Sequence, residues 1–373
     1  MRENKRLPLG ARRIRCAGRG IAFMMLVGVA SLALAASASA TGLNIVATFD
    51  SSITGNVNAV AIENDINTAI GTIDGLYSNT VTVPVTFSYT GLTGNTLLQT
   101  QVDGYFGSTY SNYVNLLKAD SAANPGNLVL ATAIANLGTG NTGGTNTTFG
   151  GMAIDGAQWG MLGNTNAFQG ATITINSNQP FALTGTADNS HYDLVGGLEH
   201  ELNEVLGGGG VGSTLNTVGS NLCNPTQTSP LCTQQGSTDL YRYSAPGTGS
   251  FTTSTLASSY FSIDGGTTSI VAFNQGGDPI CPGGDFGDFA PTGGTGGGTG
   301  QLIQNACNFF GPDEAYTTSS PEFKMMEAIG WDPISGGNVS APEPGSLPLL
   351  TTGLAALIGL CLRKKGSLAN LAS

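Results

Sequence analysis

Basic residues are almost missing from the central part of this chain of 373 residues. Between residues 41 and 341 the sequence contains only Lys118, Arg242 and Lys324, against 22 acidic residues. A surface that binds nucleic acid needs clustered basic side chains, so the composition excludes this class of partner. An acidic chain of this kind suits a soluble role outside the cell and attracts divalent cations.

Cysteine is also scarce, with six residues in the whole chain. Four of them lie in the central part: Cys223, Cys232, Cys281 and Cys307. An even number of cysteines in an exported chain predicts two disulfides. Short loops favour the pairs Cys223 with Cys232 and Cys281 with Cys307, although other pairings stay open. The C-x-x-C spacing is absent, which argues against a cysteine-rich metal site.

Residues 1–40 have the pattern of a secretory signal peptide. Seven basic residues are followed by an apolar run over 21–36 and by the small residues Ala38, Ser39 and Ala40. This order predicts export through the Sec translocon and cleavage before Thr41. The alternative is an uncleaved membrane anchor, which would also place the following residues outside the cytoplasm.

The C-terminal end carries a second targeting pattern. Pro342, Glu343 and Pro344 precede an apolar run over 347–362, which ends at the basic residues Arg363, Lys364 and Lys365. The run is close to the shortest transmembrane helix, and the basic cluster behind it should stay in the cytoplasm. The pattern resembles the PEP-CTERM sorting signal of Gram-negative bacteria. The resemblance implies an exosortase as partner, tethering to the inner membrane in transit, and delivery to the cell surface or extracellular matrix. A plain C-terminal anchor is the alternative, and cleavage of the tail stays open.

Between the two signals the sequence predicts one ectodomain over residues 41–335. A linker (336–345), a membrane-spanning sorting segment (346–365) and a short tail (366–373) follow it. The apolar patterns predict helices and strands in alternation. Helices are predicted over 57–76, 105–118, 128–137, 194–206 and 321–329. Strands are predicted over 43–49, 80–89, 171–175 (an edge strand beside a cleft), 240–243, 260–263 and 270–273. A surface loop is predicted over 276–300. The order predicts an α+β fold with a twisted mixed sheet, a long N-terminal helix and a β-rich C-terminal part.

The predicted helix over 194–206 contains His200, one of the two histidines of the chain, in the pattern His-Glu-x-x-Glu. Residues four apart share a face of a helix, so His200 and Glu204 can bind one metal ion. Glu201 lies beside them and can act as a general base. Gly196 and Gly197 weaken the helix by about 1 kcal/mol each relative to alanine, which predicts close packing against its first turn.

The segment from Asp193 to Gly207 resembles the active-site helix of metzincin-like metalloproteases, in a variant with the His-Glu-x-x-Glu motif. The similarity extends to residues 239–244, 260–266 and 328–332. It implies a zincin-like fold, a Zn²⁺ cofactor and hydrolysis of an extracellular polypeptide. In this resemblance Glu201 is the catalytic base, and His200 and Glu204 are metal ligands.

The chain departs from this family at the third ligand. Gly210 stands at the position that normally supplies it, and no histidine follows. The third ligand would then come from His191 or from a carboxylate such as Asp239 or Asp193. A site with one histidine and several carboxylates is harder and can favour another metal. Met325 and Met326 follow downstream, and core packing is the favoured role for both.

Two simpler interpretations stay open. Glu199, Glu201 and Glu204 can form a solvated acidic helix face around one histidine. Asp278, Asp285 and Asp288 can bind Ca²⁺, although simple solvation of their loop is favoured. The leading hypothesis is a surface-sorted zinc endopeptidase. The alternatives are a non-catalytic surface or matrix protein with a degenerate protease fold, and a carbohydrate-binding or adhesive module.

Overall fold

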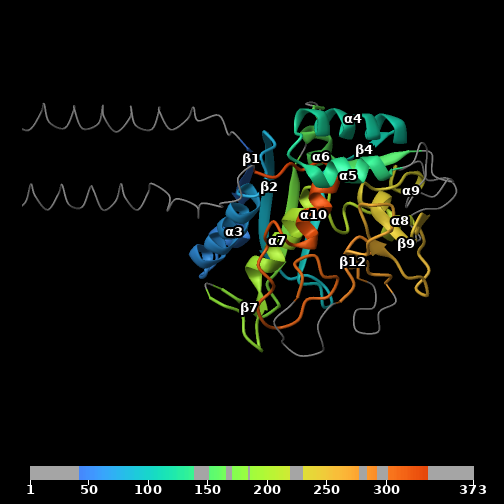
Figure 1. Ribbon diagram of the computed structural model, residues 1–373. Coiled ribbons are helices and arrows are strands. Elements are labelled where there is room, and N and C mark those ends of the chain that lie inside the picture. Colours follow the sequence, from blue (N-terminus) through green and yellow to red (C-terminus); the bar gives the residue numbers. More distant parts are fainter. Residues whose placement is uncertain are drawn as a thin grey trace, which may run out of the picture. The chain divides into compact units, whose positions relative to one another are not determined.

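A computed structural model of the protein describes residues 42–137, 151–164, 170–183, 185–218, 230–276, 284–291 and 301–334. The chain divides into two units, Met1–Ala40 and Thr41–Ser373, and all of these residues belong to the second. They combine helices with several small sheets, which confirms the α+β class (Figure 1). The predicted signal peptide and sorting segment lie outside the described residues. Within those ranges no helix is both long and apolar enough to cross a membrane.

A four-stranded mixed sheet forms the core of this unit. Its strands follow the order β1 (Leu43–Phe49), β2 (Val81–Thr90), β6 (Ala171–Asn176) and β3 (Leu98–Val102). β1, β2 and β6 are parallel, whereas β3 runs antiparallel to β6. The prediction that residues 171–175 form an edge strand is therefore wrong. β6 lies between two strands and alternates buried apolar residues, whereas β3 has polar residues between Leu98 and Val102 and forms the edge.

Two long helices pack beside this sheet. α3 (Ala59–Asp74) buries Ile62, Ile66, Ile70 and Ile73, which recur at helical spacing. α7 (Leu194–Val205) contains the His-Glu-x-x-Glu motif and contacts both α3 and β3 (Figure 1). The apolar stripe of α7 is fully buried, as expected, so the opposite side of the helix is left for polar groups.

The predicted helix over 105–118 is wrong in its first turn. Residues Tyr105–Ser108 form β4, which pairs with β5 (Met152–Asp155). α4 (Tyr110–Ala123) begins only after Thr109, whose side chain accepts a hydrogen bond from the Asn112 amide. The pairing joins segments that are distant in sequence, and it overrides the local helical pattern.

The remaining elements are short. The predicted strands of the C-terminal part are confirmed only as parts of a small sheet with the order β10 (Thr248–Gly249), β9 (Arg242–Ala245), β11 (Tyr260–Phe261) and β12 (Val271–Ala272). A 3-10 helix, η2 (Thr238–Tyr241), precedes β9. The other short elements are α2 (Ser51–Thr54), α5 (Leu128–Asn136), α6 (Gly156–Met161), β7 (Phe181–Ala182), β8 (Tyr192–Asp193), α8 (Leu215–Val218) and α9 (Pro230–Thr233).

The last helix, α10 (Pro321–Ala328), packs against α5, and the residues after it reach the C-terminal end of α7. Met325 and Met326 are fully buried in the core, as the sequence favours. Trp331 follows α10 and donates a hydrogen bond from Nε1 to the backbone oxygen of Leu206, at 2.9 Å. This bond satisfies a carbonyl at the C-terminal end of α7 and ties the end of the described chain to the motif helix.

Candidate metal centre

The first turn of α7 is closely packed, as its two glycines predict. Asp193 caps the helix and accepts a hydrogen bond from the Gly196 amide at 3.2 Å. A Cβ atom at Gly197 would lie 2.8 Å from Leu98 Cδ1 on β3, and one at Gly196 would overlap the Asp313 side chain. Glycine therefore lets the edge strand and the segment around Asp313 approach the helix that carries the motif.

His200 is held in one tautomer by its hydrogen bonds. Nδ1 lies 2.9 Å from the backbone oxygen of Ile303, which can only accept, so Nδ1 carries the proton. Nε2 lies 3.1 Å from the side-chain nitrogen of Gln304, which also donates to Asp288 Oδ1 at 2.9 Å. Because an amide nitrogen only donates, Nε2 accepts with its lone pair. A histidine that ligates a metal has this arrangement, with one nitrogen bound to a backbone carbonyl and the other presenting a lone pair.

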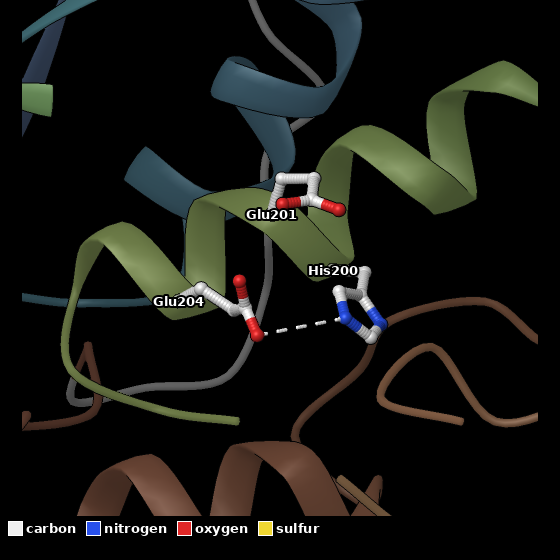
Figure 2. A group of neighbouring side chains, drawn as sticks. All are labelled: His200, Glu201 and Glu204. Carbon is white, nitrogen blue, oxygen red and sulfur yellow. Dashed lines mark ion pairs between the residues drawn. The ribbon is translucent and has the colours of Figure 1, made fainter. Parts of the chain in front are cut away.

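Two carboxylates lie close to His200 Nε2. His200 Nε2 lies 3.9 Å from Glu204 Oε1, on the same side of α7 (Figure 2), and 3.7 Å from Asp288 Oδ2. Both separations exceed the usual length of a hydrogen bond. Ligand atoms about 2.1 Å from a tetrahedral Zn²⁺ ion lie about 3.4 Å apart. The two separations are a few tenths of an ångström longer than this value, so Nε2 and each of these oxygens lie at about the spacing of two ligands of one small cation.

Glu201 lies beside this group of atoms. His200, Glu201 and Glu204 each offer one ligand atom, and these atoms lie within 4.8 Å of one another. The Glu201 carboxylate is buried, and its Oε2 atom has no hydrogen-bond partner. Thr100 on β3 donates to the backbone oxygen of Glu201 at 3.1 Å, which ties this residue to the edge strand. Glu201 is thus a buried carboxylate with one free oxygen next to the candidate ligands.

Burial shapes the electrostatics of the cluster. It raises the pKa of Glu201 and of Glu204, and for Glu204 the charges of Glu201 and the loop aspartates add to the effect. Burial also raises the pKa of Asp288 to about 7 and, together with the charge of Asp288, that of Asp285 to about 6. Among the described residues, no lysine or arginine forms an ion pair with these carboxylates, and the nearest side chain that can carry a positive charge is His200. A divalent cation would supply the positive charge that such a buried group lacks.

The interpretation of a solvated acidic helix face is wrong. Glu199, Glu201 and Glu204 are 6%, 6% and 5% exposed. Burial raises the pKa of Glu199 to about 8. Among the described residues, Glu199 does not belong to either group of potential metal ligands. The sequence pattern alone cannot tell this arrangement from a surface helix, because the segments that cover α7 come from elsewhere in the chain.

Asp239 and His191, the predicted third ligands, lie in other environments. Asp239 is fully buried and accepts hydrogen bonds from Ser213 Oγ at 2.6 Å, the Thr214 amide at 3.1 Å and the Gly236 amide at 2.9 Å. The His191 side chain is 45% exposed and pairs with Asp188 at 2.8 Å. In the described part of the chain, neither belongs to a group of potential metal ligands, and the third alternative, Asp193, caps α7.

The structure brings Asp285 and Asp288 to the site instead. Together with Glu204 they form a second group of ligand atoms within 4.8 Å of one another. The favoured prediction of a solvated loop is wrong for Asp288, which is only 3% exposed. Asp278 lies outside the described residues. The one sequence signal was the pair of aspartates around Phe286-Gly287, in a stretch with no basic residue to neutralise them.

The described residues include two of the four cysteines of the central part. Cys232 and Cys307 take part in disulfide bonds. Their predicted partners, Cys223 and Cys281, lie outside the described residues, as do the predicted sorting residues at 342–344 and 363–365. Both the pairing and the sorting signal stay predictions.

Comparisons with known proteins give no relative. No family model matches the chain. Neither a curated protein nor a solved structure is significantly similar to it. The chemistry of the site therefore has to be inferred from its own geometry.

Proposed function

We propose that the protein is a zinc-dependent endopeptidase with a zincin-like fold, in which His200 and Glu204 bind the metal and Glu201 is the general base. One observation carries this proposal. The hydrogen bond from His200 Nδ1 to Ile303 leaves Nε2 as an acceptor, and two buried carboxylates and Glu201 lie close to it.

The chemistry of the ligands supports a transition metal. Imidazole nitrogen and carboxylate oxygen are ordinary ligands of Zn²⁺, and a hydrolytic site combines few protein ligands with a free position. Zn²⁺ in such a site polarises a peptide carbonyl and makes water a stronger acid at neutral pH. The protein's own contribution is a carboxylate base with a free oxygen, Glu201 Oε2, next to these ligands.

The surroundings of α7 also support a peptidase. An antiparallel edge strand, β3, packs along the motif helix and is tied to it through Thr100. The mixed sheet with α3 and α7 beside it is compatible with a zincin-like arrangement. These contacts and the two targeting patterns together support an exported enzyme. An exosortase would deliver it to the surface, where it acts on extracellular polypeptides.

A non-catalytic surface or matrix protein is the second candidate, and one observation favours it. The Gln304 side chain donates to both His200 Nε2 and Asp288 Oδ1, so part of the cluster is satisfied within the protein itself. In that case the cluster is the remnant of a site in a degenerate protease fold, and substitution of Glu201 would change no activity.

The experiment measures metal content and hydrolysis together. Purified protein dialysed against Zn²⁺ should contain about one ion per chain, and His200→Ala should lose it. Glu201→Gln should keep the ion and lower the hydrolysis of an unfolded polypeptide by about 10²- to 10⁴-fold, because it removes the proton acceptor and preserves the shape. A wild-type protein without metal, or a Glu201→Gln variant with unchanged hydrolysis above the chelator background, would contradict the proposal.

A further inference from the structure

We propose that Asp288 is the third protein ligand of the metal centre, supplied by the loop 284–291, and that Asp285 stands on the more exposed side of the same ion. This inference rests on the proposed function, since it completes the ligand set of His200 and Glu204. It replaces the predicted ligands Asp239, His191 and Asp193.

The first argument is the space around Gly210. The Gly210 amide donates to Glu204 Oε1 at 2.9 Å. A Cβ atom at this position would lie 2.6 Å from Glu204 Oε1 and 2.5 Å from Asp285 Oδ2. A side chain at residue 210 therefore does not fit, and the carboxylate of Asp285 lies where such a side chain would begin. The loop thus places a carboxylate at the position where residue 210 cannot supply a ligand.

The second argument is the orientation of Asp288. Its Oδ1 atom accepts a hydrogen bond from Gln304, which holds the plane of the carboxylate. Its Oδ2 atom faces His200 Nε2 at 3.7 Å, too far for a hydrogen bond. A carboxylate that ligates a metal has this division, with one oxygen held by the protein and the other directed to the ion.

The third argument is that the loop is held in place without neutralising its charges. Arg242, one of three basic residues between 41 and 341, is fully buried and donates to the backbone oxygens of Phe286 and Asn274. Its guanidinium group lies 4.4 Å from the centre of the Phe273 ring. Asn216 donates to Asp285 and accepts from the Phe286 amide at 2.9 Å. The buried arginine thus fixes the backbone of the loop without forming an ion pair with either of its two carboxylates.

The unpartnered Glu201 Oε2 atom is an independent sign of a ligand. It is a buried polar atom of the same cluster, and buried carboxylate oxygens are normally hydrogen-bonded.

The resulting set has one imidazole and two carboxylates, with a third carboxylate nearby. Oxygen ligands are preferred by harder cations, so the centre should discriminate less between Zn²⁺ and Mn²⁺ than a site with three histidines.

The test is the affinity of the purified protein for Zn²⁺, measured by competition with a chromogenic chelator. Asp288→Asn should raise the dissociation constant by more than about 100-fold, since loss of groups that merely support a ligand already costs about 10- to 100-fold. Asp285→Asn should have a smaller effect, about tenfold. Asp120→Asn is the matched control, because Asp120 is a part-buried carboxylate on α4 outside both ligand groups, and it should stay within about threefold.

A second variant gives a positive signal even if Asp288→Asn folds poorly. Asp288→Cys loaded with Co²⁺ should show the near-ultraviolet charge-transfer absorption of a thiolate bound to cobalt. Asp120→Cys should not show it, because its thiol lies away from the site.

The outcomes separate the two proposals. Wild-type Zn²⁺ affinity in Asp288→Asn, without a thiolate band in Asp288→Cys, overturns the third ligand and leaves His200 and Glu204 in place. A wild-type protein that binds neither Zn²⁺ nor Co²⁺ overturns the proposed function together with this inference.

Discussion

Asp239 and Asp288 are both fully buried aspartates, and they differ in what surrounds their oxygens. Asp239 accepts hydrogen bonds from Ser213 Oγ and from the amides of Thr214 and Gly236. Asp288 accepts one side-chain hydrogen bond, from Gln304, and one backbone hydrogen bond, from Gly210, while its Oδ2 atom lies 3.7 Å from His200 Nε2.

The difference separates a structural carboxylate from a candidate ligand. The donors around Asp239 replace the hydrogen bonds to water that it loses on folding. Its carboxylate therefore links the segment at Ser213 and Thr214 to the turn at Gly236. The Asp288 cluster concentrates buried acids, and among the described residues no lysine or arginine forms an ion pair with them. These acids have fewer donors than Asp239, and a buried carboxylate of this kind is unfavourable unless it holds a proton or a cation occupies the site.

The largest expected effect is the loss of stability in Asp239→Ala. The substitution leaves a buried hydroxyl and two amides without an acceptor, so the free energy of unfolding should fall by about 3 kcal/mol or more. Urea unfolding in the presence of a chelator measures it. Under the same conditions Asp288→Asn should change the stability by less than about 1 kcal/mol, because it removes repulsion among acids and keeps the Gln304 acceptor. Equal losses in both variants would remove the distinction between the two aspartates.

The second expected effect is stabilisation by the metal. Zn²⁺ at about 100 times its dissociation constant should raise the free energy of unfolding of the wild-type protein by about 2.7 kcal/mol. The Asp239→Ala variant should gain the same increment, because its defect lies outside the metal centre. His200→Ala should gain nothing. Thermal unfolding with and without Zn²⁺ shows whether the wild-type protein and Asp239→Ala gain the same free energy of unfolding. A smaller gain in Asp239→Ala would show that Asp239 belongs to the metal centre.

Local sequence patterns predict those parts of the molecule that depend on the spacing of residues along one helix or strand. The first strand, over 43–49, and the helices α3, α7 and α10 follow from apolar residues at strand or helix periods. The pairing of His200 with Glu204 follows in the same way, because both lie on one helix. These features need no knowledge of the rest of the chain.

The remaining features depend on distant segments. β3 and the β4–β5 pair are strands only because they find partners far away in the sequence. Asp288 reaches His200 only because Gln304 holds its carboxylate and Arg242 holds its loop. The burial of the motif glutamates has the same origin, since the covering segments belong to other parts of the chain. No local pattern carries this information.

The smallest expected effect is a pH-dependent change in stability at Asp120. This part-buried carboxylate has one oxygen without a hydrogen-bond partner, and among the described residues it forms no ion pair with a histidine. Its Oδ1 atom accepts a hydrogen bond from Asn124 at 3.0 Å, whereas its buried Oδ2 atom has no hydrogen-bond partner. Burial, with the charge of Asp332, raises its pKa from 3.8 to about 7. Because the folded state holds the proton more tightly than the unfolded state, this group favours folding below about pH 4. That contribution is lost as the pH rises through about 7.

Asp120→Asn keeps the shape of the protonated acid, so it should match the wild type in stability at pH 4 and exceed it at pH 8. Urea unfolding at the two pH values measures the difference, and Zn²⁺ should not alter it. A gain of equal size at both pH values would show that charge is not the cause. A difference that disappears when Zn²⁺ is added would mean that a bare buried carboxylate suffices to bind the ion. In that case the histidine would not be what distinguishes the Asp288 cluster from Asp120.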